Sequence, residues 1–314
     1  MKNKRCKRTY HLRNWSDYNK ALVNRGSLTI WFADETVKAW INHEQTGKRG
    51  ASQIYTDAAI LCMLTLMAVY SLRLRSTQGL LHSLFRLAEI DLTVPNYTTL
   101  CRRRKLLEVV LPRQAKCRAI HLVVDSTGLK VYGEGEWKVR QHGVTKRRTW
   151  RKLHLGVDEA SGEIVAAVAT TNNVSDDEVL ADVLKQVAED VAQVSADGAY
   201  DKRKCYEAIN EKQARAVIPP RRGARLWHQD DTTDEQSARN ENVRRISEVG
   251  RAQWKRESGY YQQSLAETTI YRLKTIFGSR LSARSFEAQA CEMIVRCAAL
   301  NRMTELGMPD SYAA

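Results

Sequence analysis

Apolar residues recur at helical spacing through the first third of the chain and at strand spacing through its middle. Helical patterning covers residues 52–90, and the longest apolar run, residues 58–70, contains a single threonine. This run is shorter than the ~20 residues that cross a bilayer, so it predicts a buried helix. Two shorter helical segments, residues 76–87 and 96–105, are separated by a turn.

The second of these short helices combines a good N-cap with a basic end. It begins at Asn96, and its last positions are Arg102, Arg103, Arg104 and Lys105. One hypothesis is a helix-turn-helix whose second helix enters the major groove of DNA. A plain two-helix hairpin with a solvated basic end is an equally good interpretation of the same spacing.

The middle of the chain changes to strand patterns. Five apolar or alternating segments predict strands, at residues 119–125, 152–157, 163–169, 193–197 and 214–218. Helical patterns at residues 176–187 and 202–213 lie between the last three of them. The order βββαβαβ predicts an α/β fold built on a mixed sheet.

The remainder of the chain is predicted to be a polar insertion followed by two helices. Residues 221–256 are polar and favour an insertion or a mobile loop. A long helix is expected over residues 258–277 and a final helix over residues 285–306. We therefore divide the chain into a basic arm (residues 1–20) with a helical DNA-binding region, together residues 1–118, and a catalytic domain, residues 119–314.

Composition and charge narrow the class of partner. The chain has 314 residues, 43% of them hydrophobic, and a net charge of +14. Residues 1–152 carry +18, residues 153–201 carry −10, and residues 202–314 carry +6. The basic residues do not share one amphipathic helix, which excludes a membrane-surface protein and favours nucleic acid. No apolar signal region follows the basic N-terminus, so we expect a cytoplasmic protein. Seven cysteines without a Cys-x-x-Cys pair argue against a disulfide framework or a structural zinc site.

Three carboxylates are candidates for chemistry. Asp125 and Asp197 each end a predicted strand, where α/β sheets place functional groups. Either one alone is more often a cap or turn residue, but both strands are expected to be central in one sheet. Glu267 lies in the long helix, on one face with Tyr260, Gln263 and Lys274. A solvated salt-bridge face is the alternative interpretation of that pattern.

A converging set of carboxylates predicts metal ions. Asp125, Asp197 and Glu267 would repel one another unless cations lay between them. Oxygen ligands suit Mg²⁺ or Mn²⁺. Two such ions ~4 Å apart activate a water or hydroxyl and stabilise the leaving oxygen of a phosphodiester. Lys274 is placed to contact a phosphate.

A basic segment lies between the first two carboxylates. Residues 137–152 hold seven basic residues, two tryptophans and no acid. A solvated loop is one interpretation; contact with the DNA backbone through Lys146, Arg147 and Arg148, with Trp150 available for stacking, is the one we favour. The acidic residues that follow, Asp176, Asp177, Glu178 and Asp182, are assigned to the surface of a helix.

These motifs together resemble a known family. Asp125 to Lys130 resembles its first catalytic motif, Asp197 to Asp201 its second, and Tyr260-x2-Gln263-x3-Glu267-x6-Lys274 its third. Residues 14–28 are similar to the opening of one of its groups. The chain thus resembles a DDE transposase of a bacterial insertion sequence, of the insertion sequence five family and its 903-like group.

The resemblance implies a fold, an activity and partners. It implies a ribonuclease-H-like core in which Asp125, Asp197 and Glu267 hold two divalent ions. It further implies cleavage of double-stranded DNA at terminal inverted repeats, transfer of the 3′-hydroxyl ends into target DNA, and self-association into a synaptic complex on the bacterial nucleoid. Gln263 replaces the usual Arg, so a phosphate contact there would be neutral and weaker.

Two other functions remain compatible with the residues. A catalytically inactive, sequence-specific DNA-binding protein derived from a transposase would need only the basic arm and the helix-turn-helix. Such a protein need not keep the three carboxylates. A nuclease of the same fold would cut DNA without joining it.

Overall fold

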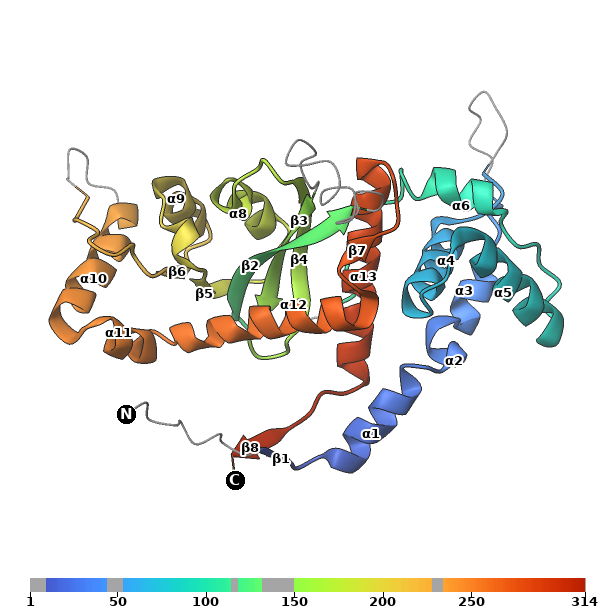
Figure 1. Ribbon diagram of the computed structural model, residues 1–314, viewed down its shortest axis with the longest axis horizontal. Coiled ribbons are helices and arrows are strands. Elements are labelled where there is room, and N and C mark those ends of the chain that lie inside the picture. The colour runs from blue at the N-terminus through green and yellow to red at the C-terminus, as the bar shows by residue number, and fades with distance from the viewer. Residues whose placement is uncertain (1–9, 44–52, 114–117, 132–149, 228–233, 314) are drawn as a thin grey trace, which may run out of the picture.

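A six-stranded mixed sheet forms the centre of the structure (Figure 1). The computed structural model describes residues 10–43, 53–113, 118–131, 150–227 and 234–313. The strands are β2 (Ile120–Val131), β3 (Trp150–Asp158), β4 (Ile164–Thr171), β5 (Val191–Ser195), β6 (Arg215–Val217) and the short β7 (Arg280–Leu281). Their order is β4-β3-β2-β5-β6, and β7 pairs with the end of β2.

The directions of the strands confirm the predicted mixed α/β fold. β2, β3 and β4 form an antiparallel meander, whereas β5 and β6 run parallel to β2. Three antiparallel strands followed by two parallel ones is the arrangement of a ribonuclease-H-like sheet. β2 is longer than predicted, because β3 continues to pair with it from Leu122 as far as Lys130. Asp125 therefore lies inside the strand and not at its end.

Helices cover both faces of the sheet. α8 (Asp176–Lys185) and α9 (Arg203–Glu211) lie on one face, and α12 (Ser264–Phe277) and α13 (Phe286–Leu306) lie on the other (Figure 1). Alternate residues of β2 serve the two layers: Leu122 and Val124 join the α8–α9 core, and Val123 and Leu129 join the core of α12 and α13. This alternation follows from the two-residue period of a strand.

Six helices precede the sheet among the described residues. They are α1 (Trp15–Asn24), α2 (Leu28–Trp31), α3 (Asp34–Lys38), α4 (Asp57–Val69), α5 (Leu74–Leu87) and α6 (Tyr97–Arg103). The two predicted short helices are thus present as α5 and α6. The backbone amide of Tyr97 donates to Gln78 Oε1 at 2.9 Å, which fixes the start of α6 against α5.

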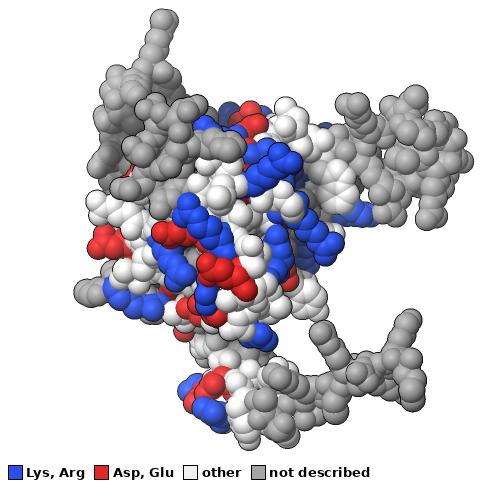
Figure 2. Space-filling view, turned by 90° about the vertical axis from the view of Figure 1, so that its left-hand side faces the viewer, with Lys and Arg blue, Asp and Glu red and all other residues white. Residues whose placement is uncertain are grey.

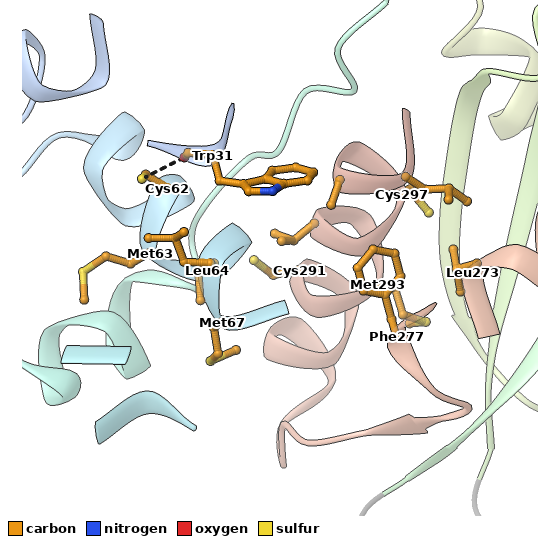
Figure 3. Close-up of a cluster of buried hydrophobic side chains, with 14 of the residues drawn as sticks. Trp31, Cys62, Met63, Leu64, Met67, Leu273, Phe277, Cys291, Met293 and Cys297 are labelled. Carbon is orange, nitrogen blue, oxygen red and sulfur yellow. Dashed lines mark hydrogen bonds between the residues drawn. The ribbon is translucent and has the colours of Figure 1, made fainter. Parts of the chain in front are cut away.

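The N-terminal helices share a core with the sheet. α4 is apolar around much of its circumference, and seven of its residues are buried. Figure 3 shows Leu64 and Met67 of α4 beside Cys291 of α13, with Phe277 of α12 also in the cluster. The hydrophobic core therefore continues across the predicted domain boundary at residue 118.

No single described helix is long and apolar enough to cross a bilayer. The pair formed by Asp57–Val69 and Leu74–Leu87 passes that test of length and composition only when taken together, and it is bent by 109°.

The two ends of the described chain are joined. β1 (Tyr10–Leu12) pairs antiparallel with β8 (Ser311–Ala313). Asn14 extends the link, because its Nδ2 donates to the Met308 carbonyl at 2.9 Å and its Oδ1 accepts from the Asp310 amide at 2.8 Å. From residue 10 onward, the predicted basic arm is consequently part of the folded structure.

The polar segment 221–256, predicted as an insertion or a mobile loop, is largely helical where the structure describes it. It contains α10 (Asp234–Val249) and α11 (Arg251–Glu257), and the 3₁₀ helix η2 (Tyr260–Gln263) follows. Arg239 of α10 is buried, and its Nε lies 2.7 Å from Asp201 Oδ1. Its guanidinium also covers the ring of Trp227 at 4.1 Å. A buried ion pair with a distant residue holds this insertion, so apolar periodicity did not reveal its helices.

Asn301 of α13 provides a test of how the helix is attached to the sheet. Its Oδ1 accepts from the Ile164 amide at 2.8 Å, and its Nδ2 donates to the carbonyls of Ile164 at 2.8 Å and Pro112 at 3.1 Å. Asn301→Ala leaves these buried groups without partners. We expect it to lower the free energy of unfolding by about 2–4 kcal/mol, measured by urea denaturation.

The matched control is the next residue. Arg302 is half-exposed, and its one ion pair within the described residues is with Glu305 on the same helix at 2.8 Å. Arg302→Ala should change the free energy of unfolding by no more than about 1 kcal/mol. Equal effects of the two substitutions would contradict the assigned role of Asn301.

Candidate active site

Parallel pairing brings Asp125 and Asp197 to the same place. Val123 of β2 is in register with Ser195 of β5, and each aspartate lies two residues further along its own strand direction. Both therefore project on the face of the sheet that α12 covers. Asp197 lies two residues beyond the end of β5 and is exposed. Its Oδ1 accepts from the Ala199 amide at 2.9 Å and caps the 3₁₀ helix η1 (Gly198–Tyr200).

Glu267 approaches the same face from the first turn of α12. The pKa of Asp125 is raised to about 6, first by burial and then by repulsion from Asp197, Glu267 and Asp176. The backbone amide of Ser126 opposes the shift by donating to Asp125 Oδ1 at 2.7 Å. The three predicted carboxylates are therefore close enough to share one electrostatic field.

The donor chemistry of this site fits a hard divalent cation. Carboxylate oxygens are the ligands that Mg²⁺ and Mn²⁺ prefer, and a cation would relieve the repulsion that raises the pKa of Asp125. Among the residues that the structure describes, no three His, Cys, Asp or Glu side chains are placed to hold one ion together. The carboxylates thus share a site without forming a closed ligand shell.

Tyr260 and Gln263 occupy different positions at this site. Tyr260 is half-buried, and its pKa is raised by burial and by the charges of Asp197, Glu267 and Asp125. Gln263 is 6% exposed, and its Nε2 donates to the Val124 carbonyl at 2.8 Å. That carbonyl belongs to the peptide bond leading into Asp125. Gln263 consequently ties α12 to β2 from inside the protein, whereas the sequence pattern suggested a phosphate contact.

The remaining predicted residue of this helix, Lys274, lies two turns beyond Glu267. It is half-buried near the end of α12. At a spacing of seven residues the two side chains share one face of the helix.

A fourth carboxylate, Asp176, acts on the same site and was missed from the sequence. It begins α8, and its Oδ1 lies 3.1 Å from Lys152 Nζ and 3.7 Å from His154 Nδ1. The pKa of His154 is lowered to about 4 by burial, so this histidine is neutral near pH 7. Because acidic residues commonly begin helices, the sequence carried no signal that set Asp176 apart from its neighbours.

Tyr200 is a further buried group beside these charges. It is 2% exposed, and its hydroxyl has no hydrogen-bond partner in the described part of the chain. Burial raises its pKa, and the charges of Asp176, Asp125 and Asp197 raise it further. The phenol is therefore a neutral wall of the site.

The predicted DNA-binding residues of α6 do not all face solvent. Arg102 and Lys105 are exposed. Arg103 pairs with Asp57 and donates to the Tyr55 carbonyl at 2.9 Å, and Arg104 is 9% exposed. Arg103 and Arg104 are thus directed into the protein and away from solvent.

The basic segment before β3 is visible only at its end. Lys146, Arg147 and Arg148 lie outside the described residues. Trp150 is half-buried. Its ring packs so closely against Gly128 that a Cβ on Gly128 would lie 3.2 Å from the ring. Lys130 Nζ lies 5.5 Å from the centre of this ring. The ring of Trp150 therefore already contacts Gly128 and Lys130 within the protein.

Charge alone does not mark the far end of the molecule as a nucleic-acid surface. At the end formed by α9, α10 and α11, basic and acidic side chains are interspersed (Figure 2). Arg245, for example, pairs with Glu248 at 3.2 Å and with Glu257 at 3.0 Å.

Comparison with known proteins identifies the family. Two models, each described as a Transposase DDE domain, match residues 23–134 and 116–302. The second covers more than half of the chain and includes Asp125, Asp197 and Glu267. The chain belongs to the DDE transposases, metal-dependent enzymes that cleave DNA.

A similar solved structure is described as a piggyBac transposase synaptic complex with hairpin DNA. The sequence identity is 12% and the TM-score 0.37. The match covers 90% of this chain and 73% of the other.

The raised pKa of Asp125 predicts a pH-dependent gain in stability when its charge is removed. A carboxyl whose pKa is higher in the folded state than in the unfolded state destabilises the fold as pH rises from about 4 through about 6. In metal-free buffer at pH 8, Asp125→Asn should therefore raise the free energy of unfolding by about 1–2 kcal/mol, allowing for partial exposure.

Urea denaturation at pH 8 and at pH 4 checks this expectation. The gain should disappear at pH 4, where the wild-type carboxyl is protonated in the folded state. Asp182→Asn is the control, because Asp182 is exposed and pairs only with Lys185. A variant that is less stable than the wild type at pH 8 would disprove the assigned cost of the Asp125 charge, which arises from burial and from repulsion.

Proposed function

We propose that this protein is an insertion-sequence transposase that cleaves DNA at terminal inverted repeats and transfers the 3′-hydroxyl ends into target DNA. The observation that supports the proposal is the convergence of Asp125, Asp197 and Glu267: the register of β2 with β5 brings the two aspartates together, and the charges of Asp197 and Glu267 add to burial in raising the pKa of Asp125. These three carboxylates come from β2, from the turn after β5 and from α12, within a chain that belongs to the DDE transposases. We infer that it belongs to the insertion sequence five family and its 903-like group.

The three carboxylates would hold two divalent ions, Mg²⁺ or Mn²⁺. Bound there, the ions would supply activation of the attacking water or 3′-hydroxyl and stabilisation of the leaving oxygen. Asp125 supplies the fixed member of the set, since β2 and the Ser126 amide hold it in place. Asp197 and Glu267 are exposed and face the solvent from which DNA arrives. Because both steps are displacements at phosphorus, one site serves cleavage and joining.

The proposed substrate is double-stranded DNA, bound by basic side chains on several parts of the protein. Arg102 on α6, Lys105 just after it, Lys274 on α12 and the segment with Lys146, Arg147 and Arg148 are the proposed backbone contacts. Tyr260 and Trp150 border the same region. Pairing of two transposon ends requires self-association into a synaptic complex. With such a substrate, the protein acts in the bacterial cytoplasm on the nucleoid.

The three carboxylates can be tested one at a time. We expect Asp125→Asn, Asp197→Asn and Glu267→Gln each to lower cleavage and joining of inverted-repeat DNA by about 10²–10³-fold or more, since each loses several kcal/mol of transition-state stabilisation. Binding of the same DNA should remain. The measurement is a gel assay of cleaved and joined products with Mg²⁺ or Mn²⁺, beside a mobility-shift assay.

Asp182→Asn on the surface of α8 is the control and should keep both steps. Near-normal strand transfer by one of the three variants would remove that residue from the ligand set. Normal transfer by all three, or a wild-type protein that binds DNA without cutting it, would favour the non-catalytic DNA-binding function.

The basic segment before β3 is expected to act through charge. Replacing Lys146, Arg147 and Arg148 together by Gln should reduce the slope of log affinity against log salt by up to about 3, since each phosphate contact contributes about 0.9. Arg245→Gln is the control, because Arg245 is paired with two glutamates. An unchanged slope in the triple variant would contradict backbone contact.

A further inference from the structure

Two adjoining cavities lie where the N-terminal helices meet the end of the sheet. One has a volume of about 240 Å³ and is lined by residues from α4, the start of α5, β7 and α13. The other, of about 540 Å³, lies between the start of α5 and α6. They share Met67, Leu72, Arg73, Arg104 and Ser282. Both are separate from the carboxylates of the proposed active site.

Arg104 is a buried cation that faces both cavities. It follows the last residue of α6 and is 9% exposed. Among the described residues its Nε has no hydrogen-bond partner, and its NH2 group makes a weak contact with Cys101 Sγ at 3.8 Å. A buried guanidinium without a counter-charge is costly to the fold. An anion bound beside Arg104 would offset this cost.

Glu292, the carboxylate that lines the smaller cavity, already has an ion-pair partner and hydrogen-bond donors. Glu292 accepts from Arg296 at 2.7 Å and from the backbone amides of Ser282 at 3.0 Å and Ala283 at 2.9 Å. These bonds occupy both carboxylate oxygens, and the charge of Arg296 offsets that of Glu292. Within the part of the chain that the structure describes, Glu292 is the only acidic residue lining either cavity.

The start of α5 adds a second positive element to the cavity wall. α5 has 14 residues, the side chain of its N-cap residue makes no capping hydrogen bond, and its first turn contains no acidic residue. The free amides and the helix dipole of such a terminus attract anions. Arg73 precedes the helix and Arg75 lies in its first turn, and both line the larger cavity.

We propose that these cavities form a phosphate-binding pocket, in which the Arg104 guanidinium and the amides at the start of α5 bind one phosphate group. A guanidinium fork matches two oxygens of a phosphate, and the helix terminus supplies donors from the other side. Exposed Arg102 also lines the larger cavity and adds positive charge. The phosphate comes either from the backbone of DNA or from a free phosphate compound. Only the DNA source rests on the proposed function.

Thermal unfolding of the full-length protein tests the pocket without DNA or catalysis. At constant ionic strength, inorganic phosphate should raise the Tm of the wild type by about 2–4 °C, because a ligand that binds only the folded state stabilises it. Arg104→Gln should remove this shift, and Arg104→Lys should keep part of it. In phosphate-free buffer, Arg104→Gln should melt no lower than the wild type, since it removes an uncompensated charge.

Arg103→Gln is the matched control. Arg103 neighbours Arg104 on α6 but pairs with Asp57 and lines neither cavity. It should keep the full phosphate-induced shift, whatever its own Tm. A wild type that does not respond to phosphate, or an Arg103→Gln variant that loses the shift as Arg104→Gln does, would overturn the proposal.

Salt-dependent binding of a DNA duplex distinguishes the two sources of phosphate. If the pocket holds a backbone phosphate, Arg104→Gln lowers the slope of log affinity against log salt by about 0.9, and Arg103→Gln leaves it unchanged. If the slope is unchanged while the phosphate-induced Tm shift is lost, the pocket takes a free phosphate compound. A protein that binds no DNA but responds to phosphate through Arg104 would contradict the proposed function and leave the pocket standing.

Discussion

The parallel pairing of β2 with β5 is the interaction on which the proposed active site depends. It sets Val123 against Ser195, and so brings Asp125 and Asp197 together on one face of the sheet. A slip of one residue would move one of the two aspartates to the opposite face. The pairing is held by cores on both sides, since Leu122 and Val124 pack toward α8 while Val123 packs toward α12 and α13. Register, and hence chemistry, is specified by burial.

The shared core of α4 and α13 gives the molecule its second constraint. α13 contacts the sheet through Asn301 and contacts α4 through Cys291. The N-terminal helices thus complete the cover of one face of the sheet and are not an appendage joined by a linker. The cavities around Arg104 lie along this contact. A phosphate bound there would stabilise the packing of the N-terminal helices against the sheet.

Electrostatics at the site favours function over stability. Burial, and after it repulsion from neighbouring carboxylates, raises the pKa of Asp125 to about 6, against the usual preference of a fold for compensated charge. Gln263 supports this arrangement from within, because it bonds the carbonyl beside Asp125 and fixes α12 against β2. Asp176, held by Lys152, adds a further negative charge. Groups held in such conflict are typical of sites that bind cations.

Much of the architecture could be predicted from the sequence, since it follows from local periodicity. The strand patterns predicted the five main strands and their order along the chain, and the amphipathic segments predicted α8, α9, α12 and α13. The family motifs pointed to Asp125, Asp197 and Glu267 as candidates. The length of β2 was not predictable, because it depends on β3 as a partner. The helices α10 and α11 were also missed, because the ion pair of Arg239 with Asp201 supports them and hydrophobic spacing does not.

The sequence by itself determined which chemical groups the protein possesses and which segments form its strands and most of its helices. Only the tertiary structure decided which of those groups share a site. It brought the charge of Asp176 within range of Asp125, turned Gln263 inward and paired Arg103 with Asp57. It also buried Arg104 with no carboxylate partner among the described residues. The physical reason is that side-chain type and periodicity are local properties of the chain. Distance, burial and compensation of charge arise from contacts between segments far apart in it.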